Sequence, residues 1–205
     1  MSTGSLVSHE AIRTLQQENI RLKNENQDLH SELTSLRQAL RSLTEFQETI
    51  PAITPRTDVF AILYRILTSA LTAVNSDNAS LLLLDEESGE LVFVESNSPY
   101  RAQLLGVHLP AGEGIAGWVV ANRTPKLVED VRYEPLFFSR IDEQIGFMSR
   151  SIICVPLLDG ERPLGALEVV NSRSGEPFLE KDLDVMMLVG GLAAQALARA
   201  EGRIP

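Results

Sequence analysis

Leucine recurs at every seventh position along the first part of the chain, and this repeat constrains the fold more than any other feature. It fills heptad position d five times in succession: Leu15, Leu22, Leu29, Leu36 and Leu43. Position a of the same heptads holds Ile12, Asn19, Asn26, Leu33 and Leu40. A sustained 3.5-residue apolar period predicts a left-handed coiled coil. We therefore expect a homodimer that is held together by the five leucines.

The polar positions of the repeat predict how the two helices pair. Asn19 and Asn26 at position a favour a parallel dimer, in which each asparagine meets its own counterpart at some cost in stability. Across a parallel dimer, glutamates at g meet the following e residues of the partner, which gives the pairs Glu18–Lys23, Glu25–His30 and Glu32–Arg37. Each exposed pair contributes only about 0–1 kcal/mol, so these pairs select orientation more than they stabilise.

Two prolines, Pro51 and Pro55, follow the repeat. Proline breaks a helix and stiffens a linker, so we expect a linker over residues 50–56. The predicted organisation is a flexible N-terminus over 1–8, a coiled-coil dimerisation helix over 9–49 and a globular domain over 57–201. A domain of about 150 residues can bury a core without disulfides or metals.

The sequence of the globular part predicts helices at both ends and strands between them. Apolar residues at helical spacing predict a helix over 58–74. Short apolar segments predict strands over 79–84, 91–96, 107–109, 126–128, 151–158 and 164–171. Further helices are predicted over 115–121, 139–145 and 180–201. This order favours an α+β fold with an antiparallel sheet flanked by helices.

Charge and composition argue against several classes of partner. The net charge is −10 at pH 7, and an acidic surface repels a phosphate backbone, so no nucleic-acid partner is expected. No signal peptide and no apolar run of about 18 residues is apparent, so no membrane association is expected. The single cysteine, Cys154, cannot form a disulfide within the chain. We therefore expect a cytoplasmic protein.

Four segments of the globular part resemble the GAF domain family. They are ASLLLLD at 79–85, GEGIAGW at 112–118, SIICVPL at 151–157 and LGALEVVN at 164–171. Their order and spacing match across about residues 56–201, and a further segment at 178–182 fits as well. The resemblance implies a GAF fold with a pocket roofed by the helix after Gly114 and by residues 133–146. The ligand stays open, because GAF domains bind cyclic nucleotides, tetrapyrroles, haem, small metabolites, or no known ligand.

Cyclic-nucleotide-binding GAF domains are similar to this chain in the roof region. The resemblance places candidate ligand contacts at Ser80, Asn97, Ile115, Ala116, Asp142, Ser149 and Glu168. Two contact positions depart from that pattern, since Ser96 replaces a base-stacking aromatic and Ile145 replaces a polar residue. Ser172 and Leu183 replace the Lys and Glu of the family signature, so its Lys–Asp bridge cannot form. Bilin binding needs a Cys-His pair and sulfoxide reduction needs several cysteines, and Cys154 alone supplies neither. No metal site and no particular cofactor is predicted.

Two features of the candidate site suggest a ligand class. The glycine-rich turn at Gly114–Gly117 opens a helix whose first amides favour an anion. Glu168 lies in an apolar strand on the face of Ala166 and Val170, where it is either a pocket carboxylate or a solvent-facing residue. If it faces the pocket, a nucleotide-like or acidic heterocyclic metabolite would offer an anion to the amides and a donor to Glu168.

The sequence thus predicts a dimeric sensory or regulatory protein rather than an enzyme. Its GAF domain would bind a small molecule or a partner and couple binding to the coiled coil, with a separate effector protein as the output. Two alternatives stay open: a ligand-free structural adaptor that only dimerises, and a regulator that binds cyclic nucleotides.

Overall fold

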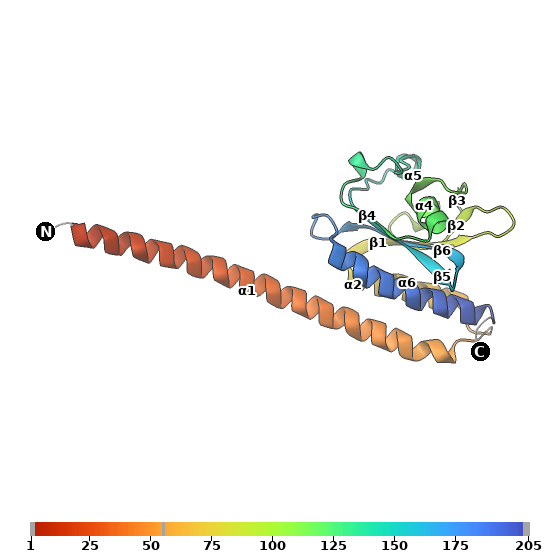
Figure 1. Cartoon of the computed structure of the whole chain (residues 1–205), viewed down its shortest axis with the longest axis horizontal. Coiled ribbons are helices and arrows are strands. Elements are labelled where there is room, and N and C mark those ends of the chain that lie inside the picture. The colour runs from red at the N-terminus through yellow and green to blue at the C-terminus, as the bar shows by residue number, and fades with distance from the viewer. Residues whose placement is uncertain (1–2, 55, 203–205) are drawn as a thin grey trace. The chain divides into compact units, whose positions relative to one another are not determined.

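The computed structural model describes residues 3–54 and 56–202, and backbone contacts divide the chain into the units Met1–Gln38 and Ala39–Pro205. Helix α1 runs from Thr3 to Thr49, so its last residues belong to the second unit (Figure 1). Within the first unit, Leu15, Leu22 and Leu29 are 69%, 52% and 57% exposed in the single chain. The side chain of Leu36 lies outside the described part. The d positions that are described in this unit therefore leave apolar surface uncovered.

The last turns of α1 contribute to the core of the second unit instead. Leu43 and Phe46 are only 7% and 2% exposed, and they pack in one cluster with Ile50 and Ile53. The predicted linker thus begins as a short 3-10 helix, η1 (Ile50–Ala52), whose first residue is buried. The repeat predicts that Leu43 contacts the second chain of a dimer. The structure corrects this, because burial of Leu43 in its own chain leaves little of its surface for a second copy.

The second unit contains a six-stranded sheet, and all of its pairings are antiparallel. Its strand order is β3-β2-β1-β6-β5-β4. The strands are β1 (Ser76–Leu84), β2 (Leu91–Asn97), β3 (His108–Leu109), β4 (Lys126–Val128), β5 (Ile152–Asp159) and β6 (Arg162–Ser172). The helices are α2 (Val59–Ala73), α3 (Arg101–Leu104), α4 (Gly114–Asn122), η2 (Val131–Tyr133), α5 (Arg140–Ile145) and α6 (Glu180–Ala200). The predicted α+β fold is confirmed; the short α3 and η2 were not predicted, since neither is long enough to show a period.

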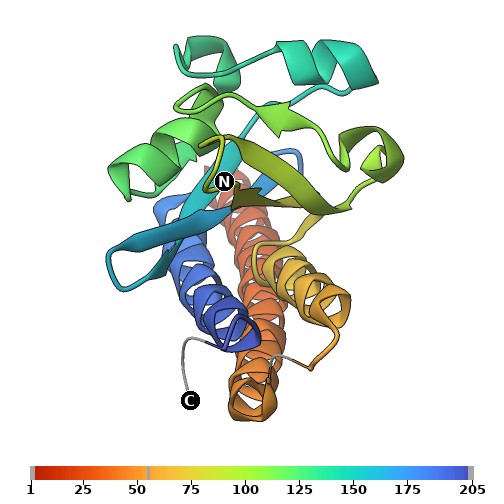
Figure 2. The same cartoon turned by 90° about the vertical axis from the view of Figure 1, so that its right-hand side faces the viewer.

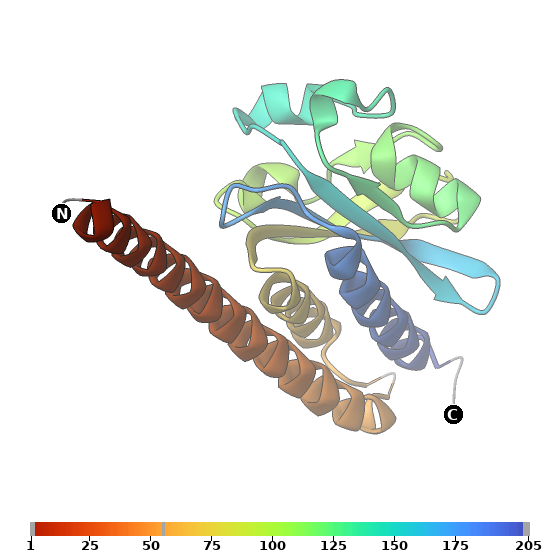
Figure 3. The ribbon, with the colours of Figure 1, turned by 60° about the vertical axis from the view of Figure 1, so that its left-hand side comes forward.

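The sheet is buried on both faces. Helices α2 and α6 lie side by side on one face (Figure 2), and α4 and α5 lie on the other (Figure 3). In β6, Leu167 and Val169 join the core under α2 and α6, whereas Ala166 and Val170 join the core under α4. Strands that are covered on both faces carry continuous runs of apolar residues. This explains why these strand segments do not alternate between apolar and polar residues.

Two glycines allow close packing that a side chain would prevent. A Cβ at Gly165 in β6 would lie 2.0 Å from the carbonyl oxygen of Leu82 in the neighbouring strand. A Cβ at Gly190 in α6 would lie 2.9 Å from a methyl group of Val155 in β5. Gly190 thus lets α6 lie close to the sheet.

Helix α6 is the one helix of the described residues that is long and apolar enough to cross a membrane. The sequence analysis expected no apolar run of about 18 residues, and α6 is an exception to that expectation. Met186, Val189 and Ala193 of this helix are fully buried in the core against the sheet. Its apolar composition is thus explained by its place as a core helix.

Candidate functional site

A cavity of ≈ 90 Å³ lies between the sheet and the elements that cover its α4 face. Strands β1, β2 and β6 supply its floor, and α4, α5 and the loops around them supply its roof. The lining residues are mostly apolar, with a few polar groups between them: Asn78, Ser80, Leu82, Phe93, Ser98, Tyr100, Leu104, Leu109, Gly114, Ile115, Ala116, Phe137, Phe138, Ile141, Asp142, Ile145, Phe147, Ser149, Glu168 and Val170.

The strand register sets a row of polar residues across the cavity face of the sheet. Ser96 pairs with Ser80, Ser80 with Glu168, Glu168 with Cys154, and Cys154 with Lys126. Directly paired residues of antiparallel strands project from the same face, so five strands bring these side chains into one line. Of these five residues, Ser80 and Glu168 line the cavity itself.

Glu168 occupies the middle of this row and lines the cavity. Its side chain is half-buried, and the surrounding protein atoms reduce the contact of the carboxyl group with water. Burial, with a smaller contribution from the negative charge of Asp142, raises the pKa of Glu168 to about 7. Its position in the cavity lining favours the interpretation of Glu168 as a pocket carboxylate.

Asp142 reaches the cavity from α5 in the roof. Its two carboxylate oxygens accept hydrogen bonds from Ser149, one from the backbone N–H at 2.7 Å and one from Oγ at 3.0 Å. The segment that follows is fixed in turn by Asn171, whose amide donates to the carbonyl of Met148 and accepts from the N–H of Arg150. The roof carboxylate is thus held by protein donors on both of its oxygens.

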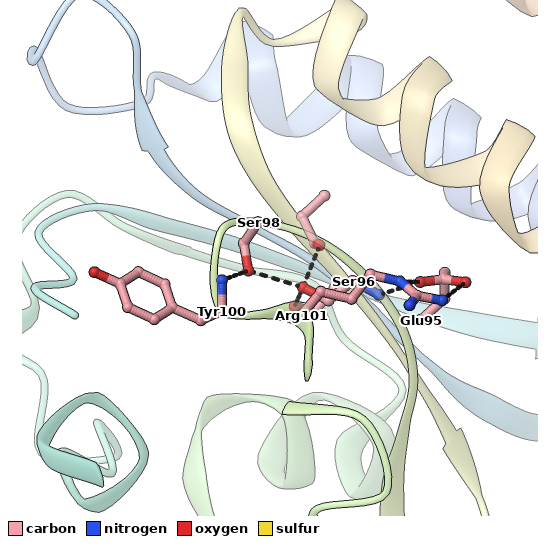
Figure 4. A network of polar contacts seen from close by, with 7 residues as sticks. Glu95, Ser96, Ser98, Tyr100 and Arg101 are labelled. Atoms are coloured by element: carbon pink, nitrogen blue, oxygen red, sulfur yellow. Dashed lines mark hydrogen bonds and ion pairs between the residues drawn. The ribbon is translucent and has the colours of Figure 1, made fainter. Parts of the chain in front are cut away.

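A hydrogen-bond network at the end of β2 fixes one wall of the cavity (Figure 4). Ser80 Oγ donates to Ser96 Oγ at 3.1 Å, and Ser96 Oγ lies 3.3 Å from Ser98 Oγ, which accepts from the N–H of Tyr100. On the other side of the strand, Arg101 makes a two-pronged ion pair with the buried Glu95. This pair lowers the pKa of Glu95 and anchors the backbone on both sides of Tyr100.

Aromatic rings form much of the cavity wall, and the sequence reading missed them. They are Phe93, Tyr100, Phe137, Phe138 and Phe147. Tyr100 and Phe147 make an edge-to-face contact with ring centroids 5.6 Å apart. The sequence analysis considered an aromatic residue only at the position of Ser96. The adjacent pair Phe137-Phe138 within the predicted roof segment was the signal available.

Six of the seven residues predicted for the site line this cavity: Ser80, Ile115, Ala116, Asp142, Ser149 and Glu168. The seventh, Asn97, is exposed at the end of β2 and is not among the residues that line the cavity. Gly114, with a φ of +68°, begins α4 at the cavity, and no side chain caps this helix. The structure therefore gathers nearly all of the predicted positions around one space.

Cys154 lies next to Glu168 in the row but is fully buried. Burial, together with the charge of Glu168, raises the pKa of its thiol well above the ordinary value, so the reactive thiolate is disfavoured. Among the described residues, no group of three or more His, Cys, Asp or Glu side chains is placed to hold a metal ion.

A two-sided antiparallel sheet with a roofed cavity on one face defines a small α+β ligand-binding module. The chain belongs to the GAF domain family, whose family model matches residues 57–198. GAF domains are sensory and regulatory domains that bind small molecules, and one relative of this chain is a phosphodiesterase. Domains from a chemotaxis protein and a sensor histidine kinase share the fold.

Two curated relatives illustrate the family context. One is the dual 3',5'-cyclic-AMP and -GMP phosphodiesterase 11A of Takifugu rubripes, 27% identical over 76% of this chain and 18% of its own length. Another is the nitrogen fixation protein VnfA of Azotobacter vinelandii, 31% identical over 69% of this chain and 31% of its own. The chain thus spans less than a third of the length of these relatives.

Solved structures support the same fold. A GAF domain from a phosphoenolpyruvate-protein phosphotransferase of Coxiella burnetii has a TM-score of 0.67 at 22% identity, covering 82% of this chain and 98% of that one. A free methionine-R-sulfoxide reductase from Neisseria meningitidis, solved with its substrate, has a TM-score of 0.63 at 21% identity. It covers 81% of this chain and 92% of that one.

Proposed function

We propose that this chain is a dimeric, cytoplasmic sensory protein whose GAF domain binds a small molecule in the cavity described above. The observation that carries the proposal is the cavity itself, in which a buried carboxyl group, Glu168, faces aromatic walls. Burying an ionisable group without a partner costs folding free energy. Groups with such perturbed pKa values cluster at functional sites. The proposed role is regulatory rather than enzymatic, with a separate effector protein as the output.

The proposed ligand is small. A cavity of ≈ 90 Å³ falls below the roughly 300–1,000 Å³ of pockets that bury drug-sized ligands. A cyclic nucleotide would enter only if the roof moved outward, so the names of the phosphodiesterase relatives do not by themselves support that ligand here.

The proposed coupling passes through the helices on the opposite face of the sheet. Strands β1 and β6 line the cavity on one face and pack against the α2 and α6 core on the other. Leu43 and Phe46 at the end of α1 belong to that same core. A ligand that shifts these strands would therefore change the packing of the helix that carries the heptad repeat.

The proposed dimer rests on the exposed d positions before Leu43, so the rod in this proposal covers about residues 9–38. Proline at both Leu22 and Leu29 breaks the helix, and we expect the double variant to lose self-association. Analytical ultracentrifugation measures this directly. A dimer unchanged by the two prolines would assign dimerisation to the globular unit.

Native mass spectrometry of freshly purified protein tests the sensor role. We expect a retained small molecule, and we expect Ala116→Leu to lose it, because Ala116 lines the cavity and is buried. Ala121→Leu is the matched control, since Ala121 is exposed on the same helix. A bare wild-type dimer, together with no stabilisation by any compound in a thermal-shift screen, would favour the ligand-free adaptor instead.

A further inference from the structure

The charged groups of the cavity all have one sign. Glu168 comes from the floor and Asp142 from the roof, and among the described residues that line the cavity none is Lys, Arg or His. The two carboxyl groups are close enough for the charge of Asp142 to act on Glu168. An anionic ligand would therefore meet two acidic groups inside a space that is poor in water.

The basic residues at the two ends of the polar row are paired with other groups. Lys126, at the end of the polar row, lies 3.1 Å from the Glu134 carboxylate and over the Trp118 ring at 5.0 Å. Arg101, beyond the other end of the row, is paired with Glu95. No described residue makes a hydrogen bond or ion pair with the Glu168 carboxyl group. Within the described part of the chain, the Glu168 carboxyl group therefore has no cationic partner.

The aromatic walls of the cavity also favour a positively charged ligand. Aromatic ring faces attract cations, and such contacts contribute most where water is excluded. Rings from β2, α3's N-terminal flank and the roof line the cavity around the two carboxyl groups: Phe93, Tyr100, Phe137, Phe138 and Phe147. Since a cavity of about 150 Å³ is enough for a benzene-sized molecule, ≈ 90 Å³ limits the ligand to a few non-hydrogen atoms.

We infer that the cavity takes a small organic cation, an ammonium or guanidinium group on a short apolar body, held between Glu168 and Asp142. The inference rests on the proposed function and names its ligand class. It departs from the acidic metabolite that the α4 amides suggested. A helix end carries only about half a positive charge, and two carboxyl groups outweigh it.

Binding of such a cation depends on pH in a defined direction. The titratable groups that face Glu168 are Asp142 from α5, Cys154 from β5 and Tyr100 from the wall beside β2. The cation and a proton compete for the Glu168 carboxylate, whose pKa is about 7 in the empty cavity. If the cation binds only the ionised form, its affinity should rise about tenfold from pH 6 to pH 8.

Three probes that share a short alkyl chain separate charge from size: n-butylammonium, 1-butanol and butyrate. Each is titrated into the full-length ¹⁵N-labelled chain at pH 6 and pH 8, and Kd is obtained from the amide shifts of Ile115 and Ala116. We expect butylammonium to bind most tightly at pH 8. We expect Glu168→Gln to weaken it at least tenfold and to remove the pH dependence, while binding of 1-butanol changes less than twofold.

Glu143→Gln is the matched control, because it removes the same charge from the exposed side of α5 and should leave all three affinities unchanged. Asp142→Asn should weaken butylammonium as well, which gives a second variant if Glu168→Gln does not fold. Binding of 1-butanol or butyrate equal to or tighter than that of butylammonium would overturn the cation assignment and leave the proposed ligand pocket intact. No shift with any probe would count against both proposals.

Discussion

Glu168→Gln should stabilise the protein at alkaline pH and have little effect near pH 5. The ordinary pKa of 4.5 applies in the unfolded chain, and burial raises the folded-state pKa to about 7. Between these values the folded state binds the extra proton, so the wild type loses stability as pH rises through this window. The folded and unfolded pKa values differ by about 2.5, from 4.5 to about 7. Each pKa unit corresponds to about 1.4 kcal/mol, so ionising Glu168 in the folded wild type at pH 8 costs about 3 kcal/mol.

Urea denaturation at fixed protein concentration, repeated from pH 5 to pH 8, measures the difference between the two proteins. Glutamine keeps the shape of the side chain and cannot ionise, so the free energies of unfolding should diverge as pH rises. Other carboxyl groups, such as Glu95 with its lowered pKa, titrate alike in both proteins and cancel in the difference. Parallel curves for wild type and Glu168→Gln would show that the Glu168 carboxyl is solvated, which refutes the reasoning.

Two matched pairs test the packing of the helices. Gly190→Ala should destabilise the protein by about 1–3 kcal/mol, because the added methyl would lie 2.9 Å from Val155, whereas Gly191→Ala meets open space and should be neutral or stabilise by up to about 1 kcal/mol. Leu43→Ala should lower the free energy of unfolding by about 2–5 kcal/mol, while Leu40→Ala, at an exposed position, should not. Chemical denaturation measures all four, and equal effects within either pair would contradict the assigned packing.

The fold was largely predictable because its local signals agree with its tertiary structure. The apolar runs of β1, β5 and β6 and the hairpin turn between the last two strands follow from rules on burial and turn chemistry. The glycine-rich turn at Gly114 marked the start of α4. By contrast, a short helix such as α3 forms on tertiary support, since four residues carry no period that a sequence reading could detect.

The positions of the candidate site residues followed from the resemblance, but the aromatic character of the cavity around them did not. Resemblance to a family placed six of seven residues around one space, yet the aromatic walls came from residues scattered along β2 and the roof. Glu168 illustrates the difference: its place in an apolar strand was plain, but its solvation depends on what covers that face of the sheet. Only the roof decides that its carboxyl is buried and that its pKa rises.

The sequence by itself determined the heptad repeat, the strand order along the chain and the single sign of the acidic surface, because these depend on local spacing and composition. The tertiary structure alone decided where the repeat stops being available to a second chain. Leu40 at position a and Leu43 at position d both belong to the predicted dimer seam, and only packing against the core makes one exposed and the other buried. Burial is a property of the neighbours that other segments bring, and no spacing rule within one helix contains that information.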